Sequence, residues 1–195
     1  MELVFRKIKE SDLKTLMTWR TNPEVSKYMY TDFEPSMERQ REWFKGISGD
    51  PTRKDWIIQA DGEDVGLLGL SRIDPVNRRC DWAYYLGSPN VRGKGIGKSV
   101  ELNVHEYVFE TLGLNKLCCE VFVSNKLVIN IHEKYGSVVE GRRVGHIYKG
   151  GEFHDIVEMS LLRDNWEKDV KGKFEFVKGR FEEVPKGGTG GESDV

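Results

Sequence analysis

Seven segments of the chain carry the apolar patterns that are typical of β-strands. Most of them alternate apolar and polar residues, which indicates strands with one buried face, and one is apolar almost throughout. The dipeptides Asp61-Gly62 and Gly150-Gly151 stand between neighbouring segments and predict tight hairpin turns. The predicted strands are residues 2–8, 55–60, 65–73, 79–86, 116–123, 138–148 and 153–162.

Four further segments have apolar residues at the three- and four-residue spacing of helices. The first follows Ser11 and Asp12, either of which can cap it, and the last places Leu127, Ile131 and Tyr135 on one face. Glycines directly after the third and fourth segments predict C-terminal caps. The predicted helices are residues 13–22, 37–45, 97–112 and 126–135.

The order of these elements predicts one domain of the α/β class with a mixed sheet: strand, two helices, three strands, helix, strand, helix and two strands. A length of 195 residues fits a single domain with a substantial core. After Trp166 the chain becomes charged, and it ends in a glycine-rich run at 187–191. We therefore expect the domain to span residues 1–166 and residues 167–195 to form a flexible extension.

Charge and cysteine content argue against several classes of function. The net charge of −2 and the pI near 6.1 do not favour a surface that binds nucleic acid. Cys80, Cys118 and Cys119 have neither a disulfide framework nor metal-ligand spacing, so we expect a cytoplasmic protein without a metal. The amino terminus is charged almost at once, and no apolar run has the length of a membrane span, so no membrane partner is expected.

A glycine-rich run at residues 91–98, between a predicted strand and a long helix, suits an anion. Its glycines allow backbone N–H groups to converge, and a helix N-terminus adds partial positive charge. Gly97-Lys98-Ser99 matches the end of a Walker phosphate loop, but Arg92 stands where that motif needs its first glycine. The spacing Gly93-x-Gly95-x-Gly97 also departs from the dinucleotide-binding fingerprint. Taken alone, the run could also be a solvated turn.

The run from Arg92 to Gly97 instead reads R-x-x-G-x-G, which resembles the pyrophosphate loop of the GNAT acetyltransferases. The resemblance implies a central, mostly antiparallel sheet that is splayed around acetyl-CoA and flanked by helices. It also implies that the loop binds this co-substrate through Val91, Arg92, Gly93, Lys94, Gly95, Ile96, Gly97 and Lys98.

Three other segments match the same family at the expected distances. Residues 82–86 resemble the strand whose open edge pairs with pantetheine, where the backbone N–H of Tyr85 or Leu86 would contact the oxyanion. Asn125 matches an asparagine that binds the cofactor arm, although it could equally cap the following helix. Residues 133–136 resemble the E-K-x-G signature that ends this helix.

Both ends of the predicted domain resemble the ribosomal-protein N-acetyltransferase-like branch of the family. Within that branch the first segment is most similar to the N-acetyltransferases of pseudaminic acid biosynthesis. This implies a small-molecule acceptor, the 4-amino group of a UDP-linked 4-amino-4,6-dideoxy sugar. The matching residues are Trp19-Arg20, 22–25 and 28–29 near the start, and 146–155, Met159 and Trp166 near the end.

The family chemistry needs a base for the ammonium and an acid for the departing thiolate. Glu120, inside the apolar run 117–123, is the candidate base, with a salt-bridged strand residue as the alternative. The family usually carries a tyrosine seven residues after the asparagine, and here that position is His132. An imidazole can protonate a thiolate near neutral pH. Alternatively, His132 is a surface residue and Tyr135 is the acid, although Tyr135 is also a candidate for core packing.

The acceptor site is expected to combine an arginine with aromatic residues. A guanidinium suits a diphosphate and aromatic rings can stack on uracil, although both residue types also occur in ion pairs and cores. The alternative functions are acetylation of a polyamine or of a protein N-terminus, and a non-catalytic acyl-CoA-binding module. The basic residues of the first helices do not favour a polyamine. An unpaired strand edge could support a homodimer. The predicted acceptor residues are Trp19, Arg20, Asn22, Tyr30, Trp82 and Tyr84.

Overall fold

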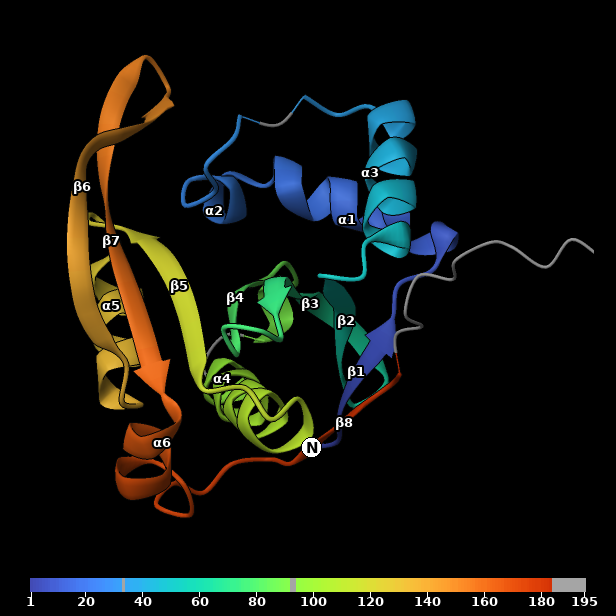
Figure 1. The fold of residues 1–195 in the computed structure, drawn as a ribbon. Coiled ribbons are helices and arrows are strands. Elements are labelled where there is room, and N and C mark those ends of the chain that lie inside the picture. The colour runs from blue at the N-terminus through green and yellow to red at the C-terminus, as the bar shows by residue number, and fades with distance from the viewer. Residues whose placement is uncertain (33, 92–93, 184–195) are drawn as a thin grey trace, which may run out of the picture.

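The computed structural model describes residues 1–32, 34–91 and 94–183, and this part of the chain forms one eight-stranded sheet (Figure 1). The strand order is β6-β7-β5-β4-β3-β2-β1-β8. Neighbours are antiparallel except for the pairs β4/β5 and β1/β8, so the predicted mostly antiparallel sheet is confirmed. The strands are β1 (Leu3–Lys7), β2 (Lys54–Ala60), β3 (Glu63–Asp74), β4 (Arg79–Leu86), β5 (Lys116–Phe122), β6 (Val138–Lys149), β7 (Glu152–Leu162) and β8 (Gly179–Phe181).

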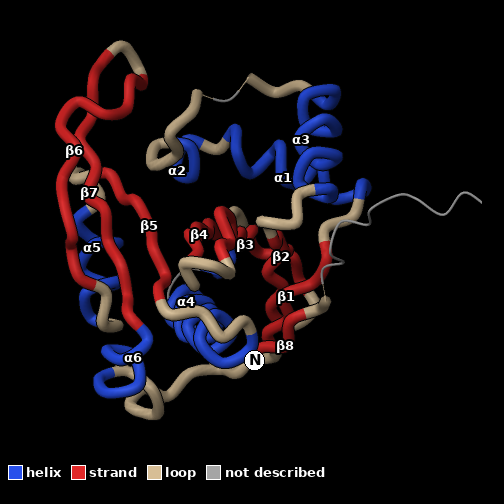
Figure 2. The backbone as a smooth tube through the Cα atoms, in the orientation of Figure 1, coloured by secondary structure: helices blue, strands red, loops and turns tan. Residues whose placement is uncertain are grey.

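Helices flank the sheet on both sides, with α1, α2 and α3 on one face and α4 and α5 on the other (Figures 1 and 2). The helix predicted over residues 97–112 consists of α4 and a π-helical turn that follows it. The helices are α1 (Leu13–Thr21), α2 (Pro23–Ser26), α3 (Met37–Gly49), α4 (Ile96–Glu106), α5 (Lys126–Lys134) and α6 (Arg163–Asp169), with 3₁₀ turns at Glu10–Asp12 and Pro89–Val91 and the π-helical turn at Tyr107–Thr111.

The alternation of side chains along the strands divides the core into two layers. Ile57 of β2 packs with α1, and Tyr85 of β4 packs against the same cluster. Trp82 and Tyr84 of β4 belong to the larger cluster, which includes residues of α4, α5 and α6. Since successive side chains of a strand point to opposite faces, β4 contributes to both layers at once.

The strands β4 and β5 are neighbours for only part of their length. They pair in parallel through Arg79–Asp81 and Lys116–Cys118. In the described ladders, the rest of β4 pairs only with β3 and the rest of β5 only with β7. The two strands therefore diverge (Figure 1), and the backbone of residues 82–86 keeps one open edge.

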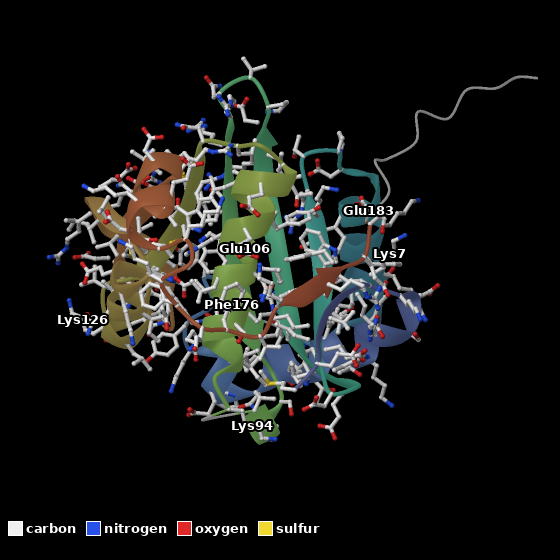
Figure 3. All side chains as sticks on the ribbon, turned by 90° about the horizontal axis from the view of Figure 1, so that it is seen from below. Lys7, Lys94, Glu106, Lys126, Phe176 and Glu183 are labelled. Atoms are coloured by element: carbon white, nitrogen blue, oxygen red, sulfur yellow. The ribbon has the colours of Figure 1, made fainter. Side chains whose placement is uncertain are left out.

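The chain beyond Trp166 belongs to the packed fold, which corrects the predicted domain boundary. Trp166 lies within α6 and is 1% exposed. The following segment crosses α4 (Figure 3) and leads to β8, which pairs with β1. There Phe181 stacks on Phe5 with 4.1 Å between ring centres. Residues 167–183 therefore complete the sheet edge, and the rest of the predicted extension, 184–195, lies outside the described residues.

Two helix predictions are corrected in detail. Asp12 occupies the N-cap position of α1 without a side-chain cap, because its carboxylate accepts a hydrogen bond of 2.8 Å from Arg6. On α5, Leu127 is 71% exposed, whereas Ile129 and His132 are buried. The buried face of α5 includes a polar residue, which a pattern of apolar positions alone cannot identify. No helix in the described ranges is long and apolar enough to cross a membrane.

Candidate active site

The diverging strands β4 and β5 border a cleft of about 630 Å³. This volume is typical of small-molecule sites, which span roughly 300–1,000 Å³. Residues from both faces of the sheet line it, because the cleft passes through the opening between the two strands. The predicted site residues that line the cleft are Arg20, Tyr30, Trp82, Tyr84, Tyr85, Leu86, Glu120, Asn125 and His132.

The open edge of β4 runs along this cleft. On the α4 face Trp82 stacks on Tyr84, with 5.6 Å between ring centres, and on the other face Tyr85 meets Trp19 edge-on. Burial raises the pKa of both tyrosine hydroxyls, so they stay neutral at physiological pH. Since these side chains leave the strand above and below the sheet, the backbone groups of residues 82–86 that β3 does not bind are available to an extended ligand.

The amino-terminal end of α4 has the geometry of an anion site. Gly95 is its N-cap and has a φ of 72°, a conformation that favours glycine. The first helical hydrogen bond runs from the Ser99 N–H to the Gly95 carbonyl, at 3.1 Å. The N–H groups of residues 96–98 therefore precede the ladder and can meet a phosphate. Figure 3 shows Lys94 at this end of the helix.

The first turn of α4 also contacts β4. A Cβ atom built on Gly97 would lie 3.1 Å from the Tyr84 hydroxyl, so the helix approaches the strand closely here. Val91 is buried beside this turn. The predicted ligands Arg92 and Gly93 lie outside the described residues.

The residues around α5 separate into one group that lines the cleft and one residue that does not. Asn125 begins the helix, but its side chain makes no cap hydrogen bond and lines the cleft. His132 is 5% exposed and also lines the cleft, so the alternative of a surface histidine is wrong. Tyr135 is 4% exposed, packs edge-on against Phe174 and does not line the described cleft.

A buried polar cluster lies directly behind His132. Its Nδ1 atom is 2.8 Å from Oε1 of Glu101, whose side chain is fully buried. The Nε2 atom of His105 is 4.0 Å from the same oxygen. Burial, and then the charge of His132, lower the pKa of His105 to about 3, so this imidazole is neutral.

The sequence reasoning missed Glu101 and His105. Both lie in the predicted helix 97–112 next to the apolar positions Val100 and Val104, where they resemble the solvated face of an amphipathic helix. The structure buries every residue from Ser99 to His105, because the sheet covers one side of α4 and the chain around residues 177–179 crosses the other.

Glu120 reaches the cleft from the α1 face of the sheet. Its Oε1 atom lies 3.7 Å from Arg72 and 3.8 Å from Arg143. The Tyr30 hydroxyl approaches this carboxylate without a hydrogen bond of ordinary geometry. Burial, and then the charge of Glu120, raise the pKa of Tyr30. Glu120 therefore forms the ion pairs expected of a salt-bridged strand residue, and it also lines the cleft as a base must.

The two arginines extend this arrangement into a charge ladder across the sheet. Arg72 also pairs with Asp81 of β4, and Arg143 also pairs with Glu158 of β7. The ladder, defined as Asp81, Arg72, Glu120, Arg143 and Glu158, alternates in sign. Its side chains are 18–70% exposed.

Two of the predicted acceptor residues lie outside the main cleft. Trp19 fills the core beneath Gly87, where an added Cβ atom would come within 2.1 Å of the indole. The Asn22 side chain caps α2 by accepting a hydrogen bond of 3.0 Å from the Glu24 N–H, and it borders a separate, smaller hollow. Arg20 does line the cleft, and it donates to the Thr31 hydroxyl at 2.9 Å.

The hairpin of β6 and β7 reaches the loop that follows α2. Lys149 donates to Asp32 at 2.9 Å, and the Gly150 N–H donates to the same carboxylate. This contact joins the β6–β7 hairpin to the loop after α2, outside the lining of the described cleft. Across the described ranges, no group of three or more His, Cys, Asp or Glu side chains is arranged to hold a metal ion.

Comparison with known proteins agrees with this architecture. Residues 2–138 match the family model described as an acetyltransferase (GNAT) domain. The chain is 26% identical over 162 residues to the spermidine N(1)-acetyltransferase of Escherichia coli strain K12, covering 83% of this chain and 86% of that protein. It is 23% identical over 133 residues to the acetyltransferase PseH of Campylobacter jejuni, covering 67% and 79%. The fold matches a Vibrio cholerae spermidine N-acetyltransferase in complex with CoA and spermine, with a TM-score of 0.79, 22% identity and coverage of 85% and 98%.

Proposed function

Because the chain belongs to the GNAT acetyltransferase family and is an acetyl-CoA-dependent N-acetyltransferase, we propose that its acceptor is a polyamine bound in the cleft between β4 and β5. The observation that carries this proposal is the presence of four carboxylates in the cleft lining, from α2, β2, β4 and β5. A polyamine carries several ammonium groups, and carboxylates bind such groups with charge-assisted hydrogen bonds. These residues are Glu24, Asp55, Asp81 and Glu120.

The four carboxylates differ in the partners they already have. Asp55 and Asp81 are held by Arg53 and Arg72. Glu24 pairs with Lys27 in an exposed contact, which contributes little and exchanges readily with another cation. Glu120 lies 3.7 Å from a nitrogen of Arg72 and 3.8 Å from a nitrogen of Arg143, both longer than a hydrogen bond. Its carboxylate is therefore the one best placed to meet an ammonium group of an acceptor.

The basic residues of the first helices no longer argue against a polyamine. Lys27, Arg39 and Arg41 each pair with a glutamate and do not line the described cleft. Among the basic residues of α1–α3 only Arg20 lines it. The cleft is thus richer in carboxylates than these helices suggest. The spermidine N(1)-acetyltransferase named among the relatives supports the same acceptor class.

The proposed reaction assigns one task to each side of the cleft. The N–H groups of α4 and the open edge of β4 hold the phosphates and the pantetheine arm of acetyl-CoA, and a β4 amide meets the oxyanion. Glu120, on the acceptor face, accepts the proton that the ammonium must lose before it attacks. His132, on the opposite face, donates a proton to the thiolate that leaves.

A second acceptor, an amino sugar linked to a nucleotide, is favoured by a different observation. Arg20 lines the cleft together with Tyr28, Trp43 and Tyr85. A guanidinium can bind a diphosphate, and the rings can stack on a base. The resemblance of Trp19-Arg20 and residues 28–29 to the pseudaminic acid branch supports this acceptor.

Steady-state turnover of acetyl-CoA with a panel of amines tests the proposal. The panel holds spermidine, spermine, a UDP-linked 4-amino sugar and a peptide with a free amino terminus. We expect the highest kcat/KM with a polyamine. A preference for the nucleotide sugar would replace the first acceptor by the second, and turnover of no amine above the buffer rate would contradict both.

A further inference from the structure

Glu101 is a carboxylate that the proposed reaction does not use, yet it lies one hydrogen bond behind the cleft. It is 0% exposed, and its Oε1 atom is 2.8 Å from Nδ1 of His132. Its Oε2 atom has no hydrogen-bond partner within the described chain. A buried carboxylate is costly unless it is paired, so His132 is the group that compensates this one.

From this geometry we infer that Glu101 is a positioning residue that fixes the orientation of His132 and so directs its other ring nitrogen, Nε2, into the cleft. The inference rests on the proposed function, in which His132 is the acid. An imidazole whose Nδ1–H donates to a carboxylate has a defined tautomer and a fixed ring plane. His132 is 6% exposed at its side chain and lines the cleft, so Nε2 is the nitrogen that can meet a ligand there.

The proton transfer that follows from this arrangement is balanced. In the charged form, His132 holds one proton on Nδ1, donated to Glu101, and one on Nε2. When the amine has attacked acetyl-CoA and the C–S bond breaks, the Nε2 proton passes to the sulfur and CoA leaves as a thiol. His132 is then neutral, with its Nδ1–H still donated to the Glu101 carboxylate, and it regains a proton from solvent.

The other titratable groups that face the Glu101–His132 pair are neutral and do not form an ion pair with either residue. Tyr84, Tyr135 and Cys119 feel the charge of Glu101, and burial raises the pKa of each, that of Cys119 to about 12. His105 is neutral, and neither of its ring nitrogens has a hydrogen-bond partner within the described residues. The ring of Trp82 also packs against that of His132, with 5.2 Å between ring centres.

Three variants test the positioning role by kinetics. Glu101→Gln should lower kcat at least tenfold while KM for acetyl-CoA stays within twofold, because general acid catalysis is worth roughly 10²–10⁴. Glu106→Gln is the matched control on the same helix, and it should be neutral because Glu106 pairs with Lys178 at the surface. The His132→Asn variant keeps a hydrogen-bond donor toward Glu101. In this background, adding Glu101→Gln should lower kcat by less than a further twofold. Full additivity of the two substitutions would overturn the inference.

A second measurement does not depend on activity, and its decisive part uses the unmodified protein. The chain has four histidines, so ¹⁵N NMR of histidine-labelled protein can resolve the tautomer of each. We expect neutral His132 to carry its proton on Nδ1 in the unmodified protein and to lose this preference in Glu101→Gln. A proton on Nε2 in the unmodified protein would overturn the positioning role. The expected tautomer in a protein that acetylates no amine would refute the proposed function and leave the pairing intact.

Discussion

The two faces of the sheet handle polar groups in opposite ways where they meet at the cleft. On the α4 face, Glu101, His105 and His132 are at most 5% exposed and their positions are fixed by packing. On the α1 face, the side chains of Glu120 and Arg72 are 23% and 70% exposed and belong to the charge ladder. Salt screens interactions between buried charges much less than interactions between exposed charges. The α4 face is therefore suited to binding the same co-substrate in every reaction, and the α1 face is suited to selecting the acceptor.

Glu120→Gln tests whether the acceptor face contains the base, and it has the largest expected effect. Removing a general base should lower kcat by roughly 10²–10⁴, while calorimetry shows the same affinity for acetyl-CoA. Glu158→Gln is the matched control, because it removes a neighbouring carboxylate of the ladder that does not line the described cleft. A loss below about threefold would make Glu120 a ladder residue only.

Gly95→Val tests the opposite face, where backbone conformation is expected to bind the co-substrate. A residue with a side chain at a φ of 72° is strained by about 1–2 kcal/mol, and a branched one by more. We expect acetyl-CoA affinity to fall roughly tenfold or more, with the KM of the amine almost unchanged. Gly46→Val on α3 provides the control, since that glycine is exposed and an added Cβ meets nothing within 4 Å. Equal affinity in a folded Gly95→Val protein would remove the loop from the site.

His105→Leu tests whether the burial of neutral His105 on the α4 face lowers the unfolding free energy at acidic pH. The pKa of His105 is about 3 in the folded chain and about 6.5 when unfolded, so only the unfolded chain gains this proton as the pH falls below 6.5. Above pH 6.5 His105 is neutral in both states, so its titration does not reduce the unfolding free energy. Below that pH, protonation of His105 in the unfolded chain alone lowers the unfolding free energy. Between pH 7 and pH 5 it should lower the unfolding free energy by about 2 kcal/mol.

Urea denaturation of both proteins at the two pH values checks this. Leucine does not titrate and leaves no buried ring nitrogen unpaired. The variant should therefore lack most of the 2 kcal/mol loss of unfolding free energy between pH 7 and pH 5. An equal loss of stability in both proteins would show that His105 does not titrate in this way.

The sequence predicted the elements whose signals are local. Asp61-Gly62 and Gly150-Gly151 adopt the positive φ angles that tight hairpin turns need, and the glycine run leads into α4. The pairing of Glu101 with His132 was beyond reach because it joins residues 31 positions apart through packing alone. The strand β8 was missed for a related reason, since three residues in a charged segment become a strand only when β1 offers them an edge.

Arg20→Gln has the smallest expected effect. The direction in which it changes the acceptor KM distinguishes a polyamine from a nucleotide-linked sugar. Removing one cation from a solvated cleft changes the binding of a charged ligand by about 0.5–1 kcal/mol. With a polyamine, less repulsion should lower the acceptor KM roughly threefold; with a nucleotide-linked sugar, the lost phosphate contact should raise it by at least as much. Arg39→Gln is the control, because Arg39 is 70% exposed, pairs with Glu34 and does not line the described cleft. Acetyl-CoA affinity should be equal in the parent protein and both variants, since Arg20 reaches the cleft from α1 and we propose that β4 and α4 bind the co-substrate. An unchanged KM for both acceptors would mean that Arg20 only holds Thr31 and the loop after α2.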